Sequence, residues 1–423
     1  MDSTGVSRRS FLTSSAQKSA AGAAAFQIIK PELVRGAGKE KLKAGVVGVG
    51  GRGRQAAIDL LTGAENVDIV ALADVFEDKL EGNLRWMREQ NPQFASRVKV
   101  EPDKRFVGFD AFKKILATDI DLVILATPPG YRPEHFEAAV AAKKHVFCEK
   151  PFGTDPVGVR RFMEAAKKSE DLKLTVVSGA QRRFHTAYLR DLKRLQDGEI
   201  GDIRAMYAYW VGTPVIQNKA RDPKYGDMEW QHRNWYSYVW ICGDQIVEQH
   251  LHNIDVCNWF MGAHPVKVWA HGGRAWRPGD ELYGNIYDHI AADFEYANGV
   301  RMSSHCRQFE RGAYQNVSEL IVGSKGQLKM DGRGTGRGDN PYVNEHIALV
   351  KSIRGDGPYL NHAMTVAEST MTCIMAREAA YSGEEVTWER IMSSKLDLQP
   401  KEFGYNLPMT STPIPVPGKY KLI

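Results

Sequence analysis

A glycine-rich segment near the N-terminus places the strongest constraint on the fold. Its glycines Gly48, Gly50 and Gly53 follow a short apolar run at 44–47 and precede a segment, 54–61, with apolar residues on one helical face. In a strand-turn-helix unit the first glycine permits a tight turn, the second lets the backbone approach a pyrophosphate, and the third allows the helix to pack against the strand. The helix N-terminus then faces negative charge. The segment from Gly48 to Gly53, with Gly51 and Arg52 inside it, therefore predicts a dinucleotide-binding loop.

Strand and helix patterns alternate after this loop, which predicts a doubly wound parallel sheet of the Rossmann type over residues 41–178. The expected strands are short apolar runs without alternation, as buried parallel strands are. These strands are expected at 44–47, 67–73, 97–100, 122–126, 145–148 and 174–177. Helices are expected at 54–61, 76–90, 110–116, 133–142 and 156–169, the last one capped by Thr154-Asp155-Pro156.

The pattern changes after Ser178. Residues 203–210 alternate between polar and apolar, and turn residues separate 290–296 from 300–305 and 319–322 from 327–330, which predicts two hairpins. Helices are expected at 186–196, 246–260 and 364–381. We therefore expect an α+β domain with an open, mainly antiparallel sheet over 179–390, followed by an extended, proline-rich tail over 391–423.

Composition narrows the function classes. Hydrophobic residues make up 43% and charged residues 25% of the chain, as in ordinary soluble proteins. The net charge is +5, but no Lys/Arg cluster is interleaved with aromatic residues, so nucleic-acid binding is not expected. The five cysteines are scattered and form no CxxC pair, which argues against a disulfide framework and a structural zinc site. No apolar run reaches the roughly 18 residues that span a bilayer.

The first 40 residues are expected to lie outside the fold as a leader. Ser7-Arg8-Arg9-Ser10-Phe11-Leu12 resembles the twin-arginine export motif, and a weakly apolar stretch of small residues follows it. This pattern predicts export to the periplasm. The alternative is a disordered tail on a cytoplasmic protein.

An acidic residue, Asp74, ends the second expected strand. A carboxylate at this place can accept hydrogen bonds from ribose hydroxyls and would repel a 2′-phosphate. The cofactor is therefore expected to be NAD, while Arg52 and Arg54 leave NADP open.

Glu149-Lys150-Pro151 follows the fifth expected strand directly. The carboxyl ends of strands in a doubly wound sheet face the ligand crevice, so Lys150 is expected to project toward it. Without that context, a lysine before proline would be a solvated loop residue.

The densest polar cluster of the chain is Glu248 to Asp255. On a continuous helix Glu248, His252 and Asp255 share one face, whereas His250 points elsewhere. A histidine beside a carboxylate can accept a hydroxyl proton, which oxidation of a carbinol requires. Two alternatives remain: a polar helix face with satisfied histidines, or a shared divalent ion held by Glu248 and His252, for which no third ligand is evident. We predict no metal.

Together these segments resemble the glucose–fructose oxidoreductase, inositol dehydrogenase and MocA family (Gfo/Idh/MocA) over about residues 42–390. The motifs that carry the resemblance are Ala44-Gly45-Val46-Val47-Gly48-Val49-Gly50, Ala73-Asp74, Ala126-Thr127-Pro128-Pro129, Glu149-Lys150-Pro151, Arg182-Arg183-Phe184, His252-Asn253-Ile254-Asp255 and Trp259-Phe260-Met261-Gly262.

The resemblance implies roles for individual residues. Cofactor contacts are implied for Thr127, Pro128 and Glu149. Lys150 is implied to assist proton transfer and to help bind and position cofactor and substrate, and His252 is implied as the catalytic histidine. Glu248 stands where many family members have Asp, and His250 stands where the family has Gly; these departures put the substrate geometry in doubt.

The function implied is oxidation or reduction of a sugar, glycoside or inositol-like polyol with NAD(P). We expect Glu248 to orient His252, with substrate contacts from Arg183, Asp255, Tyr287 and His289. Trp235, Tyr236 and Trp240 are candidates for stacking on a sugar ring or for the core. Two alternatives are a redox-neutral glycosidase or lyase that works through a transient keto-sugar, and a non-catalytic dinucleotide sensor. A tightly bound cofactor and a dimer or tetramer built through the open sheet are further expectations, the latter by analogy.

Overall fold

A computed structural model describes residues 41–423 apart from 216–217, 219, 278, 280 and 332–338. The twin-arginine motif at Arg8-Arg9 lies outside the described residues. Among the described residues, no helix combines the length and the apolar character needed to cross a membrane.

The N-terminal half is built on a six-stranded parallel sheet with the order β3-β2-β1-β4-β5-β6. The strands are β1 (Leu42–Val47), β2 (Val67–Asp74), β3 (Arg105–Val107), β4 (Leu122–Leu125), β5 (His145–Cys148) and β6 (Val176–Ser178). The helices between them are α2 (Gly51–Gly63), α3 (Glu77–Glu89), α4 (Ala111–Leu116), α5 (Arg132–Ala141) and α6 (Pro156–Asp171). β4 is buried along its whole length, as expected for a strand covered on both faces. The predicted Rossmann sheet is confirmed.

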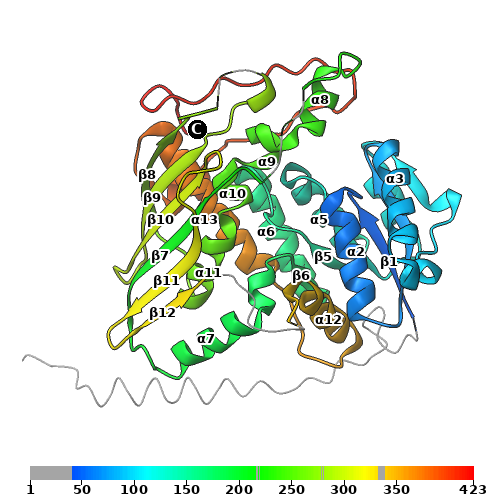
Figure 1. Ribbon diagram of the computed structural model, residues 1–423, viewed down its shortest axis with the longest axis horizontal. Coiled ribbons are helices and arrows are strands. Elements are labelled where there is room, and N and C mark those ends of the chain that lie inside the picture. The colour runs from blue at the N-terminus through cyan, green and yellow to red at the C-terminus, as the bar shows by residue number, and fades with distance from the viewer. Residues whose placement is uncertain (1–40, 216–217, 219, 278, 280, 332–338) are drawn as a thin grey trace, which may run out of the picture. The chain divides into compact units, whose positions relative to one another are not determined.

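Two layers of helices cover the parallel sheet. Side chains of α2 and α3 form one core cluster, and side chains of α4, α5 and α6 contribute to another. The first cluster also contains Leu349, Val350 and Ile353 of α12 (Pro341–Arg354), which packs beside α2 (Figure 1). A helix far along the chain, which was not predicted from the sequence, therefore completes one face of the N-terminal sheet.

The C-terminal half is built on a seven-stranded sheet with the order β12-β11-β7-β10-β9-β8-β13. Its strands are β7 (Ile203–Gly212), β8 (Lys267–Gly273), β9 (His289–Glu295), β10 (Arg301–Gln308), β11 (Asn316–Gly323), β12 (Gln327–Met330) and β13 (Val386–Thr387). Only the β7–β10 pair is parallel. The mainly antiparallel sheet and both hairpins, β9–β10 and β11–β12, are confirmed.

Helices cover one face of this sheet, so burial alternates along β9 and β10. The remaining helices of this half are α7 (Thr186–Gln196), α8 (Asp227–Arg233), α9 (Val239–Cys242), α10 (Gln245–Glu248), α11 (Leu251–Met261), α13 (Ala363–Ser382) and α14 (Trp388–Ser393). Figure 1 shows α11 and α13 against the sheet. The chain from 394 to 423 contains neither helix nor strand.

Two local predictions were wrong. Residues 97–100 form no strand, since only Val98 bridges to Ile69, and the edge position beside β2 belongs to β3. The helix predicted over 246–260 is broken at Gln249 and His250 into α10 and α11.

Candidate active site

The glycine turn between β1 and α2 has the geometry that its sequence predicts. Gly48 has φ +86°, and a Cβ there would lie 2.5 Å from the backbone nitrogen of Thr127. A Cβ on Gly53 would lie 1.9 Å from the carbonyl oxygen of Gly48. At Gly50 and Gly51, by contrast, a Cβ would meet nothing within 4 Å. The turn is therefore closed toward the protein and open on the side where a pyrophosphate would approach.

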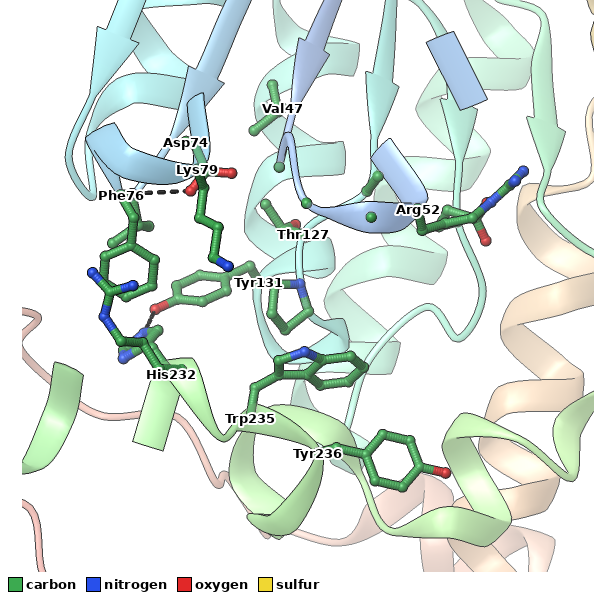
Figure 2. A pocket seen from close by; sticks show the side chains of 18 of the residues that line it. Val47, Arg52, Asp74, Phe76, Lys79, Thr127, Tyr131, His232, Trp235 and Tyr236 are labelled. Carbon is green, nitrogen blue, oxygen red and sulfur yellow. Dashed lines mark hydrogen bonds and ion pairs between the residues drawn. The ribbon is translucent and has the colours of Figure 1, made fainter. Parts of the chain in front are cut away.

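Asp74 lies at the end of β2 beside this turn. Its carboxylate accepts the backbone N–H of Val49 at 2.7 Å and that of Phe76 at 2.9 Å. Burial raises the pKa of Asp74 above its usual value, against the effect of these two hydrogen bonds. Figure 2 shows the Lys79 side chain running past Asp74 into the cavity. This end of the cavity offers a fixed carboxylate and a nearby ammonium group.

Arg52 lines the cavity, but its guanidinium group is engaged with three carboxylates. It donates to Glu149, to Asp59 at 3.2 Å and to Glu345 of α12 at 3.1 Å. Arg52 and Glu149 were both predicted to bind the cofactor. In the structure the guanidinium group of Arg52 and the carboxylate of Glu149 form an ion pair with each other. Their observed role is to hold α2, the end of β5 and α12 together.

Thr127 and Pro128 line the cavity after β4, and a buried arginine holds this segment in place. Arg132 donates to the carbonyl oxygen of Thr127 at 2.7 Å and to that of Pro151 at 2.6 Å. Arg132 therefore ties the segment after β4 to the segment that carries Lys150. Arg132 was not predicted as a site residue, because nothing in its local sequence distinguishes it from a solvated arginine.

Lys150 and Glu248 form a buried pair in the cavity. The Nζ of Lys150 lies 3.0 Å from Oε1 of Glu248 and 2.5 Å from the Glu248 carbonyl oxygen. The other carboxylate oxygen of Glu248 accepts from Gln249 at 2.6 Å. Both oxygens of Glu248 are thus engaged by other partners, so the expectation that Glu248 orients His252 is corrected: Glu248 positions Lys150.

His252 lies in the same cavity and is more than nine-tenths buried. Its ring stacks on Trp210 of β7, with 5.8 Å between centroids and 25° between planes, and its Nδ1 is buried without a partner. Burial, and then the positive charges of Lys150 and Arg182, lower the pKa of His252 well below 6.5. The imidazole is therefore neutral near pH 7 and able to accept a proton.

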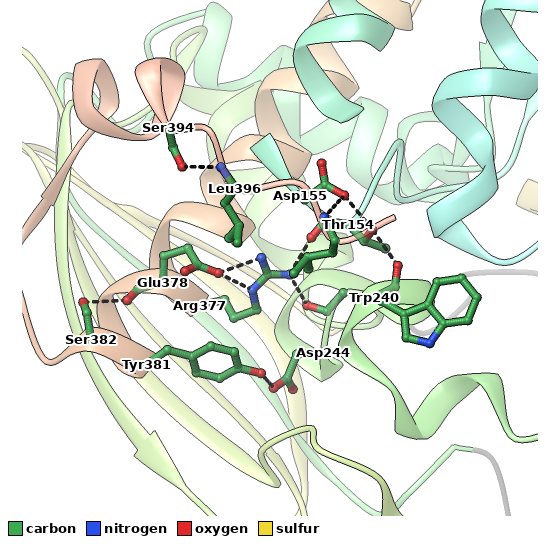
Figure 3. Close-up of polar contacts among 12 residues, drawn as sticks. Thr154, Asp155, Trp240, Asp244, Arg377, Glu378, Tyr381, Ser382, Ser394 and Leu396 are labelled. Atoms are coloured by element: carbon green, nitrogen blue, oxygen red, sulfur yellow. Dashed lines mark hydrogen bonds and ion pairs between the residues drawn. The ribbon is translucent and has the colours of Figure 1, made fainter. Parts of the chain in front are cut away.

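A cluster of buried residues holds the two chain segments that carry Lys150 and Glu248. Arg377 of α13 is fully buried and donates to the carbonyl oxygens of Thr154 at 2.6 Å and Gly243 at 3.0 Å (Figure 3). Asp244 follows with a positive φ of +77°, caps α10, and accepts a hydrogen bond from the Tyr381 hydroxyl. Because Thr154 lies close to Lys150 in the chain and α10 ends at Glu248, α13 fixes the two segments relative to each other.

The cavity measures about 1060 Å³ and contains the glycine turn, Asp74 and the Lys150–Glu248–His252 group in its lining. Trp235 and Tyr236 also line it, and Figure 2 shows Trp235 across the cavity from Thr127. Trp240 does not line it and instead donates to Gln231 at 2.7 Å in the interior. Of the three aromatic residues that were candidates for stacking or for the core, two thus line the cavity and Trp240 lies in the core.

The four residues expected on the substrate side do not line this cavity. Arg183 and Asp255 form a two-point ion pair with each other at 2.8 Å. Tyr287 donates its hydroxyl to the carbonyl oxygen of Pro415 at 2.8 Å, and His289 pairs with Asp288 at 2.7 Å. The structure therefore does not bring the four predicted substrate contacts to the cavity, and it gives each of them a partner within the protein. Asp255 does not share a helical face with Glu248, because the helix is interrupted between these two residues.

The described residues provide no further ligand for the divalent ion that Glu248 and His252 were considered to share. Within the part of the chain that the structure describes, no three His, Cys, Asp or Glu side chains gather as a metal site would require. His250 instead bonds to Ser304 at 2.7 Å and to Asn253 at 3.3 Å. The five cysteines are buried and free.

Residues from the C-terminal half cover the Asp74 end of the cavity. Arg233 of α8 lies over the ring of Phe76 at 3.9 Å and over that of Tyr225 at 4.6 Å, and it pairs with Asp78 at 3.0 Å. These contacts join α8 to the start of α3. A nucleotide bound here would thus be enclosed by both halves of the protein.

Two family models match the chain, one for each half. The model described as "Oxidoreductase family, NAD-binding Rossmann fold" matches residues 42–177, and the Gfo/Idh/MocA C-terminal domain model matches residues 189–329. The first covers the glycine turn, Asp74 and Lys150, and the second covers Glu248 and His252.

Relatives and solved structures agree with these matches. Inositol 2-dehydrogenase of Rhizobium meliloti is 26% identical over 50% of this chain and 57% of its own length. Myo-inositol 2-dehydrogenase of Thermotoga maritima is 26% identical over 55% of this chain and 58% of its own length. The chain thus spans little more than half of these relatives. The structure of scyllo-inositol dehydrogenase from Lactobacillus casei with bound NAD(H) and scyllo-inositol has a TM-score of 0.63 at 22% identity, covering 82% of this chain and 99% of that one, which shows a shared fold.

Proposed function

Because the chain belongs to the Gfo/Idh/MocA oxidoreductase family, with an NAD-binding Rossmann domain, we propose that it oxidises a carbinol of a sugar, glycoside or inositol-like polyol. The observation that carries the proposal is a neutral histidine, His252, in one cavity with the Lys150–Glu248 pair and the open glycine turn. Inositol dehydrogenases among the relatives support this substrate class.

The chain's own residues divide the chemistry as follows. His252 accepts the hydroxyl proton of the substrate, since its imidazole is uncharged at neutral pH. Lys150, held by Glu248, donates a hydrogen bond to the same hydroxyl oxygen and stabilises the negative charge that develops there. Bound NAD supplies the hydride acceptor.

The glycine turn fits the pyrophosphate of a dinucleotide, and the end of β2 fits its ribose. Gly50 and Gly51 leave the backbone open for the pyrophosphate, and Asp74 suits a free 2′-hydroxyl. We therefore propose NAD in preference to NADP.

A nucleotide assay followed by a substrate screen tests the proposal. Purified protein is heat-denatured, the supernatant is assayed for NAD(H), and separate protein is titrated with NAD. The protein is then incubated with inositols, sugars and glycosides while NADH absorbance is followed. His252→Ala should abolish turnover and keep NAD affinity; a fully active variant would remove His252 from the mechanism. Absence of both bound and bindable NAD(H) would refute the cofactor assignment.

One observation favours a second candidate, a redox-neutral glycosidase or lyase. The contacts of Arg233 with Phe76 and Asp78 enclose the nucleotide end of the cavity, which suits a cofactor that stays bound through many turnovers. Cleavage of a glycoside without accumulation of NADH would select this candidate over a net dehydrogenase.

We also propose twin-arginine export and self-association. Export rests on the Arg8-Arg9 motif and is tested by locating an Arg8→Lys/Arg9→Lys variant in cell fractions. Self-association through the outer face of the seven-stranded sheet is supported by Trp269, which is 49% exposed there, and by the stacked pair Tyr209–His305. Light scattering of wild type and Trp269→Lys tests it: a mass that stays that of a monomer in wild type would refute it.

A further inference from the structure

The C-terminal tail covers the wall of the cavity from outside at the Asp74 end. Residues 403–409 contain neither helix nor strand and run beside α8 (Figure 1). Neither family model reaches this segment, since the second one ends at residue 329. Its contacts connect the two halves of the protein at the place where the nucleotide is expected.

The backbone of the tail is bonded to α8. The carbonyl oxygen of Tyr405 accepts the N–H of Glu229 at 3.2 Å, and that of Leu407 accepts the N–H of Met228 at 3.3 Å. A Cβ on Gly226, directly before α8, would lie 2.6 Å from the Tyr405 carbonyl oxygen, so the two backbones are in close contact. Because these bonds join backbone to backbone, we expect the tail to move together with α8.

Two aromatic side chains of the tail contact the N-terminal half instead. The ring of Tyr405 lies 5.1 Å from that of Phe109 between centroids, and its hydroxyl donates to the carbonyl oxygen of Val75. Phe403 stacks on Phe109, with 5.7 Å between centroids and 28° between planes, and its ring lies 5.4 Å from that of Tyr131. The tail is thus fixed to one half by its backbone and to the other by these two side chains.

The residues that the two side chains contact belong to the cavity wall. Four of them line the cavity, namely Val75, Phe76, Phe109 and Tyr131. Phe403 and Tyr405 do not line the cavity themselves. A bound nucleotide would therefore touch the wall but not these two side chains.

Helix α8 closes the same end of the cavity from the C-terminal half. Its residues His232 and Arg233 line the cavity, and Arg233 pairs with Asp78 at the start of α3. For a nucleotide to leave at this end, α8 has to separate from the start of α3. Because the tail is bonded to α8, this separation also breaks the contacts of Phe403 and Tyr405 with the N-terminal half.

From these contacts we propose that Phe403 and Tyr405 form a latch, which holds α8 against the N-terminal half and slows the exchange of bound NAD(H) with free nucleotide. Both are positioning residues, since they act through the cavity wall and not on the cofactor directly. The inference rests on the proposed NAD binding and specifies how the cofactor is retained.

A latch and a direct nucleotide contact differ in their kinetics. The contacts of the latch join protein to protein, so they hold the cavity closed in free and in loaded protein alike. Weakening them should speed entry and release by the same factor and leave the dissociation constant nearly unchanged. Loss of a direct nucleotide contact would instead raise the release rate and the dissociation constant together.

The test measures entry and release of NADH by stopped flow, with energy transfer from tryptophan to NADH as the signal, since Trp230 and Trp235 line the cavity. Release is started by mixing the loaded protein with excess NAD. Tyr405→Ala removes the ring contacts and one hydrogen bond, so both rates should rise at least about tenfold, while the dissociation constant changes less than about twofold.

Two further variants make the test specific. Tyr405→Phe keeps the ring but loses the bond to Val75, so both rates should rise by about fivefold or less; it carries the test if Tyr405→Ala does not fold. Tyr420→Ala is the matched control, because this tail tyrosine contacts Glu378 and Tyr381 of α13. Both of its rates should remain those of wild type.

The outcomes separate the latch from the proposed function. Unchanged rates in Tyr405→Ala, or a faster release with a proportionally higher dissociation constant, would overturn the latch while NAD binding stands. Equal acceleration by Tyr420→Ala would also overturn it, because any loosening of the tail would then suffice. A wild-type protein that binds no NADH would refute the proposed cofactor itself, and the latch with it.

Discussion

Replacing Gly53 by alanine tests the closed side of the glycine turn. The new Cβ would lie 1.9 Å from the Gly48 carbonyl oxygen, 1.5 Å short of the 3.4 Å at which ordinary contact begins. The atom it meets is backbone, so no side-chain rotation relieves the clash, and the turn must separate from α2. We expect a cost of about 3 kcal/mol, the upper end of the usual range for overpacking. For a chain of this size that corresponds to a fall in Tm of about 4 °C.

Two further glycine variants complete the experiment. Gly50→Ala meets nothing within 4 Å and has an ordinary φ of −67°, so the unliganded protein should keep its Tm while its NAD affinity falls at least tenfold. Gly82→Ala lies on α3, where nothing is near; it should raise stability by up to about 1 kcal/mol through helix propensity alone.

The readouts are thermal unfolding without and with saturating NAD, and calorimetric titration of NAD. A Gly53→Ala protein that unfolds within about 1 °C of wild type would refute the packing assignment. A Gly50→Ala protein that binds NAD as wild type does would refute the approach of the pyrophosphate to the open side.

Three other predictions follow from the same structure. Asp74→Asn removes the buried charge but keeps a hydrogen-bond acceptor, so it should weaken NAD binding and reduce the preference for NAD over NADP. The ratio of the dissociation constants of NADP and NAD measures this preference. Arg377→Met should cost about 3–5 kcal/mol in unfolding free energy because it leaves the Glu378 carboxylate buried without its cation; a loss below 1 kcal/mol in denaturant titration would contradict this role. The pKa of His135 is lowered to about 3, chiefly by burial and further by Arg132, whereas its unfolded value is about 6.5. The unfolded state therefore binds the proton first, and acidification from pH 7 to 5.5 should cost wild type about 1 kcal/mol more stability than His135→Gln; equal losses would show that His135 titrates normally.

Local patterns predicted much of the fold and the nucleotide half of the site. The strand-turn-helix glycines and Asp74 could be read directly, because turn geometry and strand burial depend on a few consecutive residues. Helix α12 also carried local signals that were not used: Asn340 caps it, Pro341 begins it, and Gly355 ends it with φ +78°.

The catalytic half depended on contacts that no local pattern contains. The prediction that Glu248 and Asp255 share one face required an unbroken helix. The helix is interrupted at Gln249 and His250, where the N–H of His250 donates to the carbonyl oxygen of Gln245 at 3.2 Å. Asp255 consequently meets Arg183 instead of the cavity. Arg132 and Arg377 escaped prediction for the same reason, since their partners lie on other segments of the fold.

The return of α12 to the N-terminal sheet also governs how this protein can be made and divided. Leu349, Val350 and Ile353 complete the core around α2, and Leu360 and His362 bond to Val176 of β6. When only the first 178 residues have been synthesised, these side chains are absent, so the core around α2 is still incomplete at that stage of translation. A chimera that exchanges this half between relatives must carry two separate pieces of chain, 41–178 and 341–362.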